Sequence, residues 1–228
     1  MRNLAYFNHE RRDLLALIPP DVKTILEVGC GAGGTAVGLR ERGVRQLVGI
    51  EINELAATQA RTRFDRVIVG DVEEVTASLP DTDFDLIVYG DVLEHLVDPW
   101  EALTACRRLL KPHGHILLSV PNVRHWRLLY DLAIRGRWTY QDEGGTLDRR
   151  HLRFFTRDDL VTMVIGAGYQ PVNEGHNEFG AFVTWIDRLS CGTLRGFLVW
   201  QYYLLARIQP RSERQDNNKN SLPRNLVS

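Results

Sequence analysis

Four glycines within six residues mark the segment of this chain with the clearest chemical meaning. They lie between Gly29 and Gly34 in EVGCGAGG, directly after an apolar run at 24–28. Glycine permits a tight turn and lets a ligand approach the backbone closely. An ordinary turn between a strand and a helix needs fewer glycines, so the segment predicts a cofactor-binding loop.

Acidic residues at defined distances from this loop narrow the choice of cofactor. Glu51 lies 22 residues after Gly29, where dinucleotide-binding folds place a ribose-binding acid, so an NAD(P)-dependent oxidoreductase is one interpretation. Two further acids favour S-adenosylmethionine instead: Glu27 precedes the loop by two residues, and Asp71 follows a third apolar run. The elements after residue 122 are also too short for the substrate domain of a dehydrogenase.

The elements that must position these residues alternate between short apolar runs and helical patterns. Strands are expected at 24–28, 46–51, 66–69, 84–89, 115–120, 169–174 and 199–208. Helices are expected at 9–18, 33–42, 53–63, 99–110, 123–137, 156–167 and 181–190. Strands separated by helices predict a parallel sheet with right-handed crossovers, and therefore helices on both faces.

Five motifs in this order resemble those of class I methyltransferases that use S-adenosylmethionine. They are ILEVGCGAGG, VGIEIN, GDVEE, FDLIVYGDVLEHLVDPW and LLKPHGHILLSVPN, across residues 20–122. Together with RRHLRFFTRDDL they are similar to ubiquinone-type O-methyltransferases and to bacterial polysaccharide or secondary-metabolite methyltransferases. The resemblance implies a Rossmann-like, doubly wound α/β sheet of seven mostly parallel strands, with an antiparallel last strand.

The resemblance also implies roles for individual residues. Glu51 would bind the ribose hydroxyls, and Asp71 the adenine amino group, with Ile52 or Val72 against the ring. Asp91 would either meet the amino end of the methionine portion or cap the next helix. The remaining residues expected around the cofactor are Glu27, Gly29, Gly31, Gly33 and Gly90, with Arg11 and Tyr6 as looser matches in the N-terminal segment.

Two histidines, His95 and His151, are candidates for a general base that would act on the molecule that accepts the methyl group, because an imidazole titrates near neutral pH. Either could instead have a purely structural role. Glu94, His95 and Asp98 form no convincing ligand set, since adjacent helical residues do not face one another, and we expect no metal.

A lid is expected over residues 123–198, where four aromatic residues alternate with arginines: Trp126, Tyr130, Trp138 and Tyr140. Aromatic rings stack on rings or sugars, and arginines pair with phosphate or carboxylate. This combination predicts a small acceptor with a ring and an anionic group, such as a nucleotide-linked sugar or a lipid-carried phenol with peripheral membrane contact. The alternative is an amphipathic helix that packs its aromatics on the sheet.

Composition limits the remaining possibilities. The net charge is −1, with 44% hydrophobic and 25% charged residues, which argues against a DNA or RNA substrate. Three widely spaced cysteines, no apolar N-terminal run and no stretch of membrane-spanning length predict a cytoplasmic enzyme. We expect one domain over 1–208 and a disordered tail over 209–228, and we keep a non-catalytic cofactor-binding subunit as a third alternative.

Overall fold

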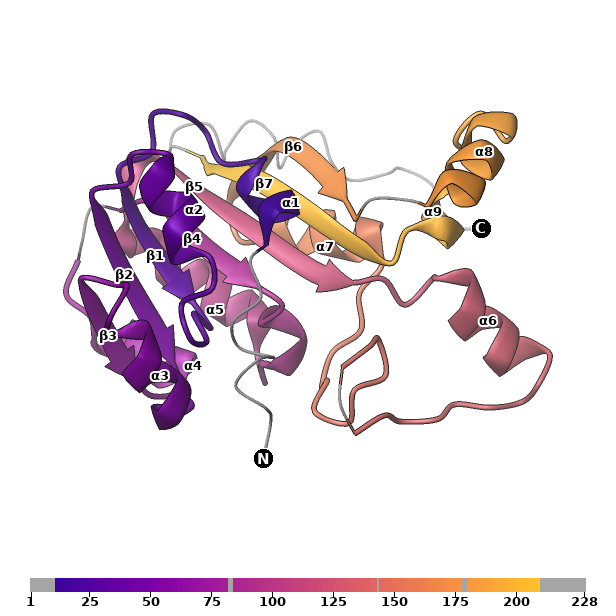
Figure 1. Cartoon of the computed structure of the whole chain (residues 1–228), viewed down its shortest axis with the longest axis horizontal. Coiled ribbons are helices and arrows are strands. Elements are labelled where there is room, and N and C mark those ends of the chain that lie inside the picture. Colours follow the sequence, from indigo (N-terminus) through magenta and orange to yellow (C-terminus); the bar gives the residue numbers. More distant parts are fainter. Residues whose placement is uncertain (1–10, 82–83, 143, 178–179, 210–228) are drawn as a thin grey trace, which may run out of the picture.

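Seven strands form a single sheet in a computed structural model that describes residues 11–81, 84–142, 144–177 and 180–209. The strand order is β3-β2-β1-β4-β5-β7-β6 (Figure 1). The strands are β1 (Thr24–Val28), β2 (Gln46–Glu51), β3 (Arg66–Val69), β4 (Phe84–Gly90), β5 (Leu110–Pro121), β6 (Tyr169–His176) and β7 (Gln201–Ile208). Strands β1 to β5 pair in parallel, whereas β7 pairs antiparallel with β5 and β6, which confirms the predicted sheet.

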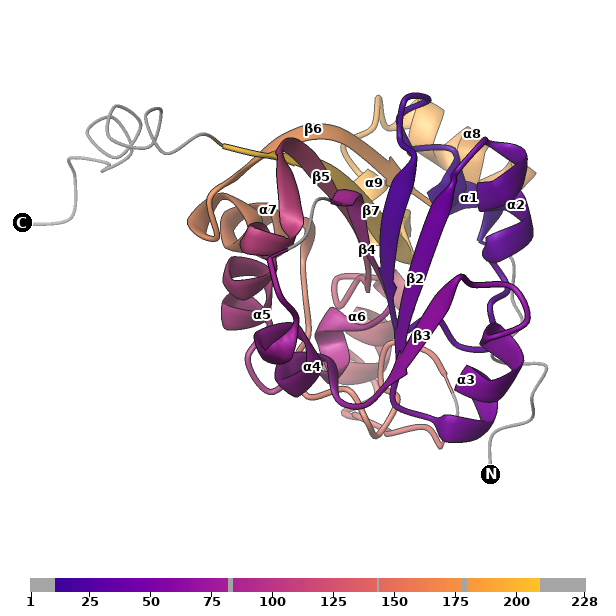
Figure 2. The same cartoon turned by 90° about the vertical axis from the view of Figure 1, so that its left-hand side faces the viewer.

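Helices cover both faces of this sheet (Figure 2). One face carries α1 (Arg12–Leu15), α2 (Ala36–Glu41) and α3 (Glu54–Ala60); the other carries α4 (Val72–Ser78), α5 (Pro99–Ala105) and α7 (Arg157–Gly166). Alternate strand side chains supply the two cores, because successive residues of a strand point to opposite faces. Ile25 therefore packs towards α1 and α2, and Leu26 towards α4, α5 and α7.

The parallel arrangement brings the ends of β1, β2 and β4 to one edge of the sheet. Strand β1 is followed by Gly29 and β4 by Asp91, β2 ends on the polar residue Glu51, and the strand interiors are almost wholly buried. In open α/β sheets ligands bind outside this carboxyl edge, where neighbouring crossovers diverge. The fold thus exposes the glycine loop, Glu51, Gly90 and Asp91 along a single rim.

Several helices begin or end elsewhere than the sequence predicts. The helix expected over 33–42 starts only at Ala36, because Gly31 and Gly33 adopt left-handed backbone conformations. The helix expected over 99–110 changes at Cys106 into the 3-10 helix η3 (Cys106–Leu109). Strand β5 starts at Leu110, five residues early, and its register against β4 is irregular there. Helix α4 was not expected at all; the Asp71 side chain caps it by accepting from Glu73 N at 2.8 Å.

Two helical insertions extend from one end of the sheet (Figure 1). Helix α6 (Trp126–Ala133) follows β5 and is shorter than the expected 123–137, while α8 (Ala181–Leu189) and α9 (Arg195–Leu198) lie between β6 and β7. The alternative that α6 packs its aromatics on the sheet is wrong, since no residue of α6 is buried.

Two expectations fall outside the residues that the structure describes: the tail beyond Gln209 and the cofactor contact of Tyr6. Within the described residues, none of the helices combines the length and apolar character needed to cross a bilayer.

Candidate active site

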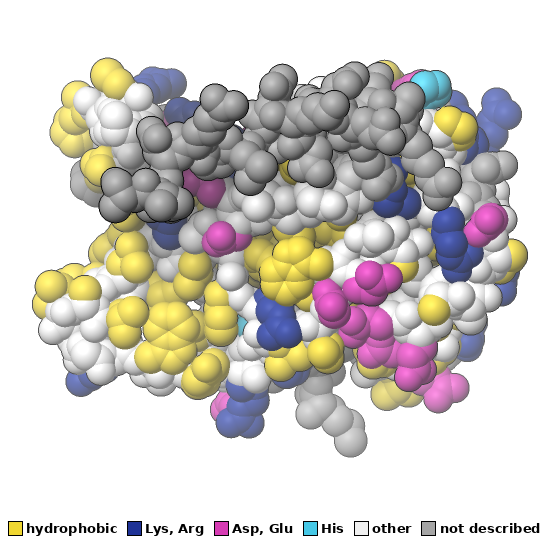
Figure 3. All heavy atoms as spheres, turned by 180° about the vertical axis from the view of Figure 1, so that it is seen from behind, with side chains coloured by type: hydrophobic (Ala, Val, Ile, Leu, Met, Phe, Trp, Pro, Cys, Tyr) yellow, Lys and Arg dark blue, Asp and Glu magenta, His cyan; other side chains and the backbone are white. Residues whose placement is uncertain are grey.

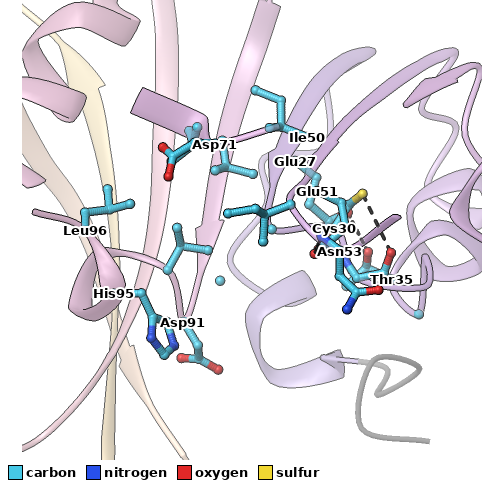
Figure 4. A pocket seen from close by; sticks show the side chains of 18 of the residues that line it. Glu27, Cys30, Thr35, Ile50, Glu51, Asn53, Asp71, Asp91, His95 and Leu96 are labelled. Atoms are coloured by element: carbon cyan, nitrogen blue, oxygen red, sulfur yellow. Dashed lines mark hydrogen bonds between the residues drawn. The ribbon is translucent and has the colours of Figure 1, made fainter. Parts of the chain in front are cut away.

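A cavity of about 630 Å³ opens at the carboxyl edge of β1, β2 and β4 (Figure 4). Figure 4 shows Glu51, Asp71 and His95 on different sides of it. Its lining includes nine of the ten residues predicted to bind cofactor: Glu27, Gly29, Gly31, Glu51, Ile52, Asp71, Val72, Gly90 and Asp91. The residues that the sequence singled out separately are therefore brought together in one site.

The glycine loop forms the wall between β1 and α2. Gly29 has a φ of +69°, and a Cβ atom there would lie 2.5 Å from Val92 Cγ2. Gly33, the tenth predicted residue, does not line the cavity; a Cβ there would lie 3.3 Å from Phe64, so this glycine permits packing against the end of α3. Gly34 reaches the cavity in its place.

Glu51 ends β2 as a buried carboxylate with 5% of its surface exposed. One oxygen, Oε2, accepts from Gly31 N at 2.8 Å, and the other, Oε1, accepts from Asn53 N at 2.8 Å. These bonds hold the carboxylate at the cavity wall and link it to the glycine loop. Glu51 is therefore a fixed part of the cavity wall and not a solvated surface carboxylate.

Glu27 is buried at the base of the glycine loop. The Thr35 hydroxyl donates to its carboxylate, 2.7 Å from Oε1 and 2.6 Å from Oε2. Burial raises the pKa of Glu27 to about 7, although the Thr35 hydrogen bond and the Arg11 charge both oppose the rise. This group can therefore change its charge near neutral pH, in a cavity where a positively charged ligand would favour the ionised form.

Asp91 follows β4 in a left-handed backbone conformation, with φ +58°. Its carboxylate accepts from Arg11, from Gln201 Nε2, and from Ser119 Oγ at 2.5 Å. Arg11 Nη2 also donates to Ser119 Oγ at 3.0 Å. The side chain of Asp91 does not cap the following 3-10 helix η2 (Leu93–His95).

This network contains two residues that sequence reasoning missed. Ser119 could have been identified from the sequence, because it is a polar residue within the apolar run HILLSV. Nothing in the sequence indicates Gln201, because only the antiparallel pairing of β7 with β5 brings it beside Asp91. Arg11 also lines the cavity, and its side chain is mostly buried, so it does not lie on a solvated helix face.

The two predicted histidines lie together although 56 residues separate them. Their ring centroids are 4.8 Å apart. His95 lines the cavity, whereas His151 contacts the His95 ring and is not part of the cavity lining. His95 Nδ1 lies 3.2 Å from the Arg150 carbonyl, and His151 Nδ1 lies 3.0 Å from the Thr146 carbonyl. A carbonyl oxygen only accepts, so each neutral ring carries its proton on Nδ1 and has its lone pair on Nε2.

Glu94 is a third side chain that lies close to the two histidines. It is 1% exposed, its Oε1 lies 4.0 Å from His151 Nε2, and its carboxyl oxygens have no hydrogen-bond partner among the described residues. Burial, reinforced by Asp91 and Asp148, raises its pKa well above the ordinary value.

The same three side chains have a spacing that would suit a divalent cation. Glu94, His95 and His151 each offer one ligand atom, and these atoms lie within 4.8 Å of one another. From the sequence, Asp98 was the third candidate ligand beside Glu94 and His95, whereas the fold brings His151 to that place. The expectation of no metal stays a prediction.

Comparisons with known proteins agree with this geometry. The chain matches the model of a methyltransferase domain family over residues 2–174. It is 30% identical to a ubiquinone biosynthesis O-methyltransferase of Cereibacter sphaeroides, covering 80% of this chain and 74% of the relative. It is also 30% identical to a probable S-adenosylmethionine-dependent methyltransferase of Mycobacterium tuberculosis, covering 66% of this chain. The match spans only half the length of that mycobacterial protein.

A solved structure shows the same fold. A SAM-dependent methyltransferase from Archaeoglobus fulgidus superimposes with a TM-score of 0.64 and 21% identity, over 89% of this chain and 96% of the other. The oxidoreductase alternative finds no support in these comparisons. The chain belongs to the family of S-adenosylmethionine-dependent methyltransferases.

Proposed function

We propose that this protein transfers a methyl group from S-adenosylmethionine to a hydroxyl of a small ring-bearing molecule. The supporting observation is that one cavity holds a glycine loop with a buried carboxylate at one side and the His95 imidazole at the other. The glycine loop and the buried carboxylate suit an adenosyl cofactor. The imidazole suits removal of a proton from a hydroxyl group.

The residues present fit such a cofactor. Glu51 already uses one lone pair of each oxygen on a backbone N–H, which fixes it so that further lone pairs can accept from two ribose hydroxyls. Asp71 and the apolar side chain of Val72 line the part of the cavity beyond β3, where the adenine would lie. Gly29 and Gly31 leave space for the methionine portion beside Glu27 and Arg11.

Bound S-adenosylmethionine supplies an activated methyl group, so the protein contributes mainly alignment of the two reactants, worth roughly 7–11 kcal/mol. A hydroxyl acceptor must also lose a proton. We assign this step to Nε2 of His95, which lines the cavity, and a positioned base contributes a factor of about 10²–10⁴. His151, edge-on to His95 and outside the cavity lining, is the second candidate.

The cavity surroundings and the relatives both support this choice of acceptor class. Arg150 reaches the cavity, and the segment that carries it also holds aromatic residues, which suits a sugar, a phenol or a quinone precursor. The Cereibacter relative is named for O-methylation in ubiquinone biosynthesis, in line with a phenolic acceptor. The free cysteines of the described chain fit a reducing compartment, so cytoplasmic location stays our prediction.

The test measures transfer of an isotopically labelled methyl group to a panel of phenol and sugar hydroxyls, with amines and thiols as alternatives. We expect label in a hydroxyl, and His95→Ala to lower kcat by about 10²–10⁴ while S-adenosylhomocysteine still binds. His113→Ala is the matched control, since His113 is exposed and remote from the cavity. Label only in amines or thiols, or full activity in His95→Ala, would contradict this proposal.

A further inference from the structure

Helix α8 exposes two large apolar side chains on one of its sides. Trp185 and Leu189 lie four residues apart, so they share one side of the helix, and they are 58% and 64% exposed. Asp187 is turned inward and pairs with Arg195 at 2.8 Å, while Arg188 is exposed. A surface helix normally does the opposite and buries its apolar stripe.

Helix α6 and the residue after it repeat this arrangement. Trp126, Tyr130 and Ile134 follow one another at four-residue spacing and are 45%, 47% and 70% exposed. Trp138 and Tyr140 continue the exposed apolar surface beyond the helix. Two separate segments of the chain therefore carry outward-facing apolar stripes, each of which includes a tryptophan.

Contacts at their bases fix the two insertions to each other. The Asn122 side-chain amide donates to the carbonyls of Gly196 at 3.0 Å and Val199 at 2.7 Å. Arg124 lies 4.7 Å over the Phe197 ring, and the His125 and Trp200 rings meet edge to face at 4.5 Å. Both helices consequently extend from one end of the molecule, where hydrophobic side chains gather in Figure 3.

Positive charge surrounds these stripes, although the whole chain has a net charge of −1. Residues 123–140 contain one acid, Asp131, and four arginines: Arg124, Arg127, Arg135 and Arg137. Residues 180–200 contain two arginines and one acid, Asp187. Tryptophan, tyrosine and leucine beside arginine are the residues that settle at the boundary between anionic headgroups and acyl chains.

We propose that α6 and α8 dock together on the surface of an anionic lipid bilayer. The exposed stripes enter the interface and the arginines contact headgroup phosphates, while the helices lie on the bilayer and do not cross it. A second copy of this chain fits the surface less well, because face-to-face packing would bring like charges together.

Flotation of the full-length protein with lipid vesicles tests the proposal. We expect binding to vesicles that contain phosphatidylglycerol and none to phosphatidylcholine alone. Trp185→Ser with Leu189→Ser removes the α8 stripe and lowers the partition coefficient roughly tenfold or more. The control, Trp100→Ser with Leu55→Ser, makes the same changes at exposed positions of α5 and α3 and leaves binding unchanged.

Retained affinity for S-adenosylhomocysteine shows that each variant is folded. Equal partitioning of the α8 variant and the wild type, or no binding to anionic vesicles, overturns the proposal. Concentration-dependent self-association in sedimentation velocity that the α8 changes abolish, without vesicle binding, would instead identify this face as an interface between copies.

Discussion

Replacement of Glu51 by alanine tests the assignment on which the cofactor site depends. The carboxylate is buried and held by two backbone N–H groups, and it is expected to accept from both ribose hydroxyls. Truncation removes this acceptor pair and leaves the N–H groups of Gly31 and Asn53 without their partner. The change therefore affects both ligand binding and the glycine loop.

The magnitude follows from the kind of bond that is lost. A hydrogen bond to a charged group contributes about 1.5–3 kcal/mol, and water entering the space recovers part of the total. We expect a net loss of about 3 kcal/mol in binding S-adenosylhomocysteine, which is roughly a hundredfold in Kd. The two orphaned N–H groups cost the protein a further ~1–3 kcal/mol in its free energy of unfolding.

Isothermal titration separates the ribose contact from general damage if the ligand is changed as well. A 2′-deoxy analogue should bind the wild type more weakly than S-adenosylhomocysteine, but both should bind Glu51→Ala equally, because the partner of that hydroxyl is gone. Glu54→Ala is the control, since Glu54 is exposed and does not line the cavity. Unchanged affinity in Glu51→Ala, or an undiminished 2′-deoxy effect, refutes the ribose assignment.

Two further changes probe the loop itself. Because burial raises the pKa of Glu27 to about 7, the folded protein holds a proton that the unfolded chain releases near its ordinary value. Stability should therefore fall as pH rises from about 4.5 through 7, by about 3 kcal/mol in urea titrations, and Glu27→Gln should remove this slope. The affinity for S-adenosylmethionine should rise over the same pH range in the wild type but not in Glu27→Gln, because the positive charge of the ligand favours the ionised Glu27 carboxylate. An affinity that does not change with pH in the wild type would contradict this. Gly29→Ala should weaken S-adenosylhomocysteine binding and destabilise the protein beyond the ~1–2 kcal/mol of a left-handed alanine, owing to its overlap with Val92. Gly136→Ala, at φ +62° with open space around it, should show that backbone cost alone, and equal losses in both variants would exclude the steric argument.

The cofactor half could be predicted because local sequence determines most of it. A glycine needed at φ +69° and an acid at the end of a strand leave a signature in neighbouring residues, so Gly29, Glu51 and Asp71 all line the predicted cavity. Helix α4 was not predicted, although Asp71 caps it, because that aspartate was interpreted as a ligand contact or a turn residue and not as a helix cap. One side chain can both bind a ligand and cap a helix. The motif that indicates the ligand contact gives no sign of the cap.

The opposite wall could not be predicted in the same way, since distant segments build it. Gln201 reaches Asp91 only because β7 inserts antiparallel beside β5, and His151 reaches Glu94 only because the loop after α6 returns under the sheet edge. Neither contact leaves a periodic or spaced pattern in the sequence. The two histidines were recognised by residue type and by their places after the fourth strand and in the arginine-rich loop, but not as neighbours of each other. Their tautomers depend on carbonyls that no motif indicates.

This division between the two walls has a chemical basis. Binding a constant cofactor requires particular atoms at fixed places, and glycine backbone and buried carboxylates provide them through short-range geometry. Methyl transfer from an activated donor requires mainly alignment, which many different side chains can provide. The wall that we propose for the acceptor includes His95 and Arg150. Its chemistry would depend on how Glu94 and the loop at 146–151 hold these two side chains. Changes that shift this loop should therefore alter acceptor choice while leaving cofactor affinity intact.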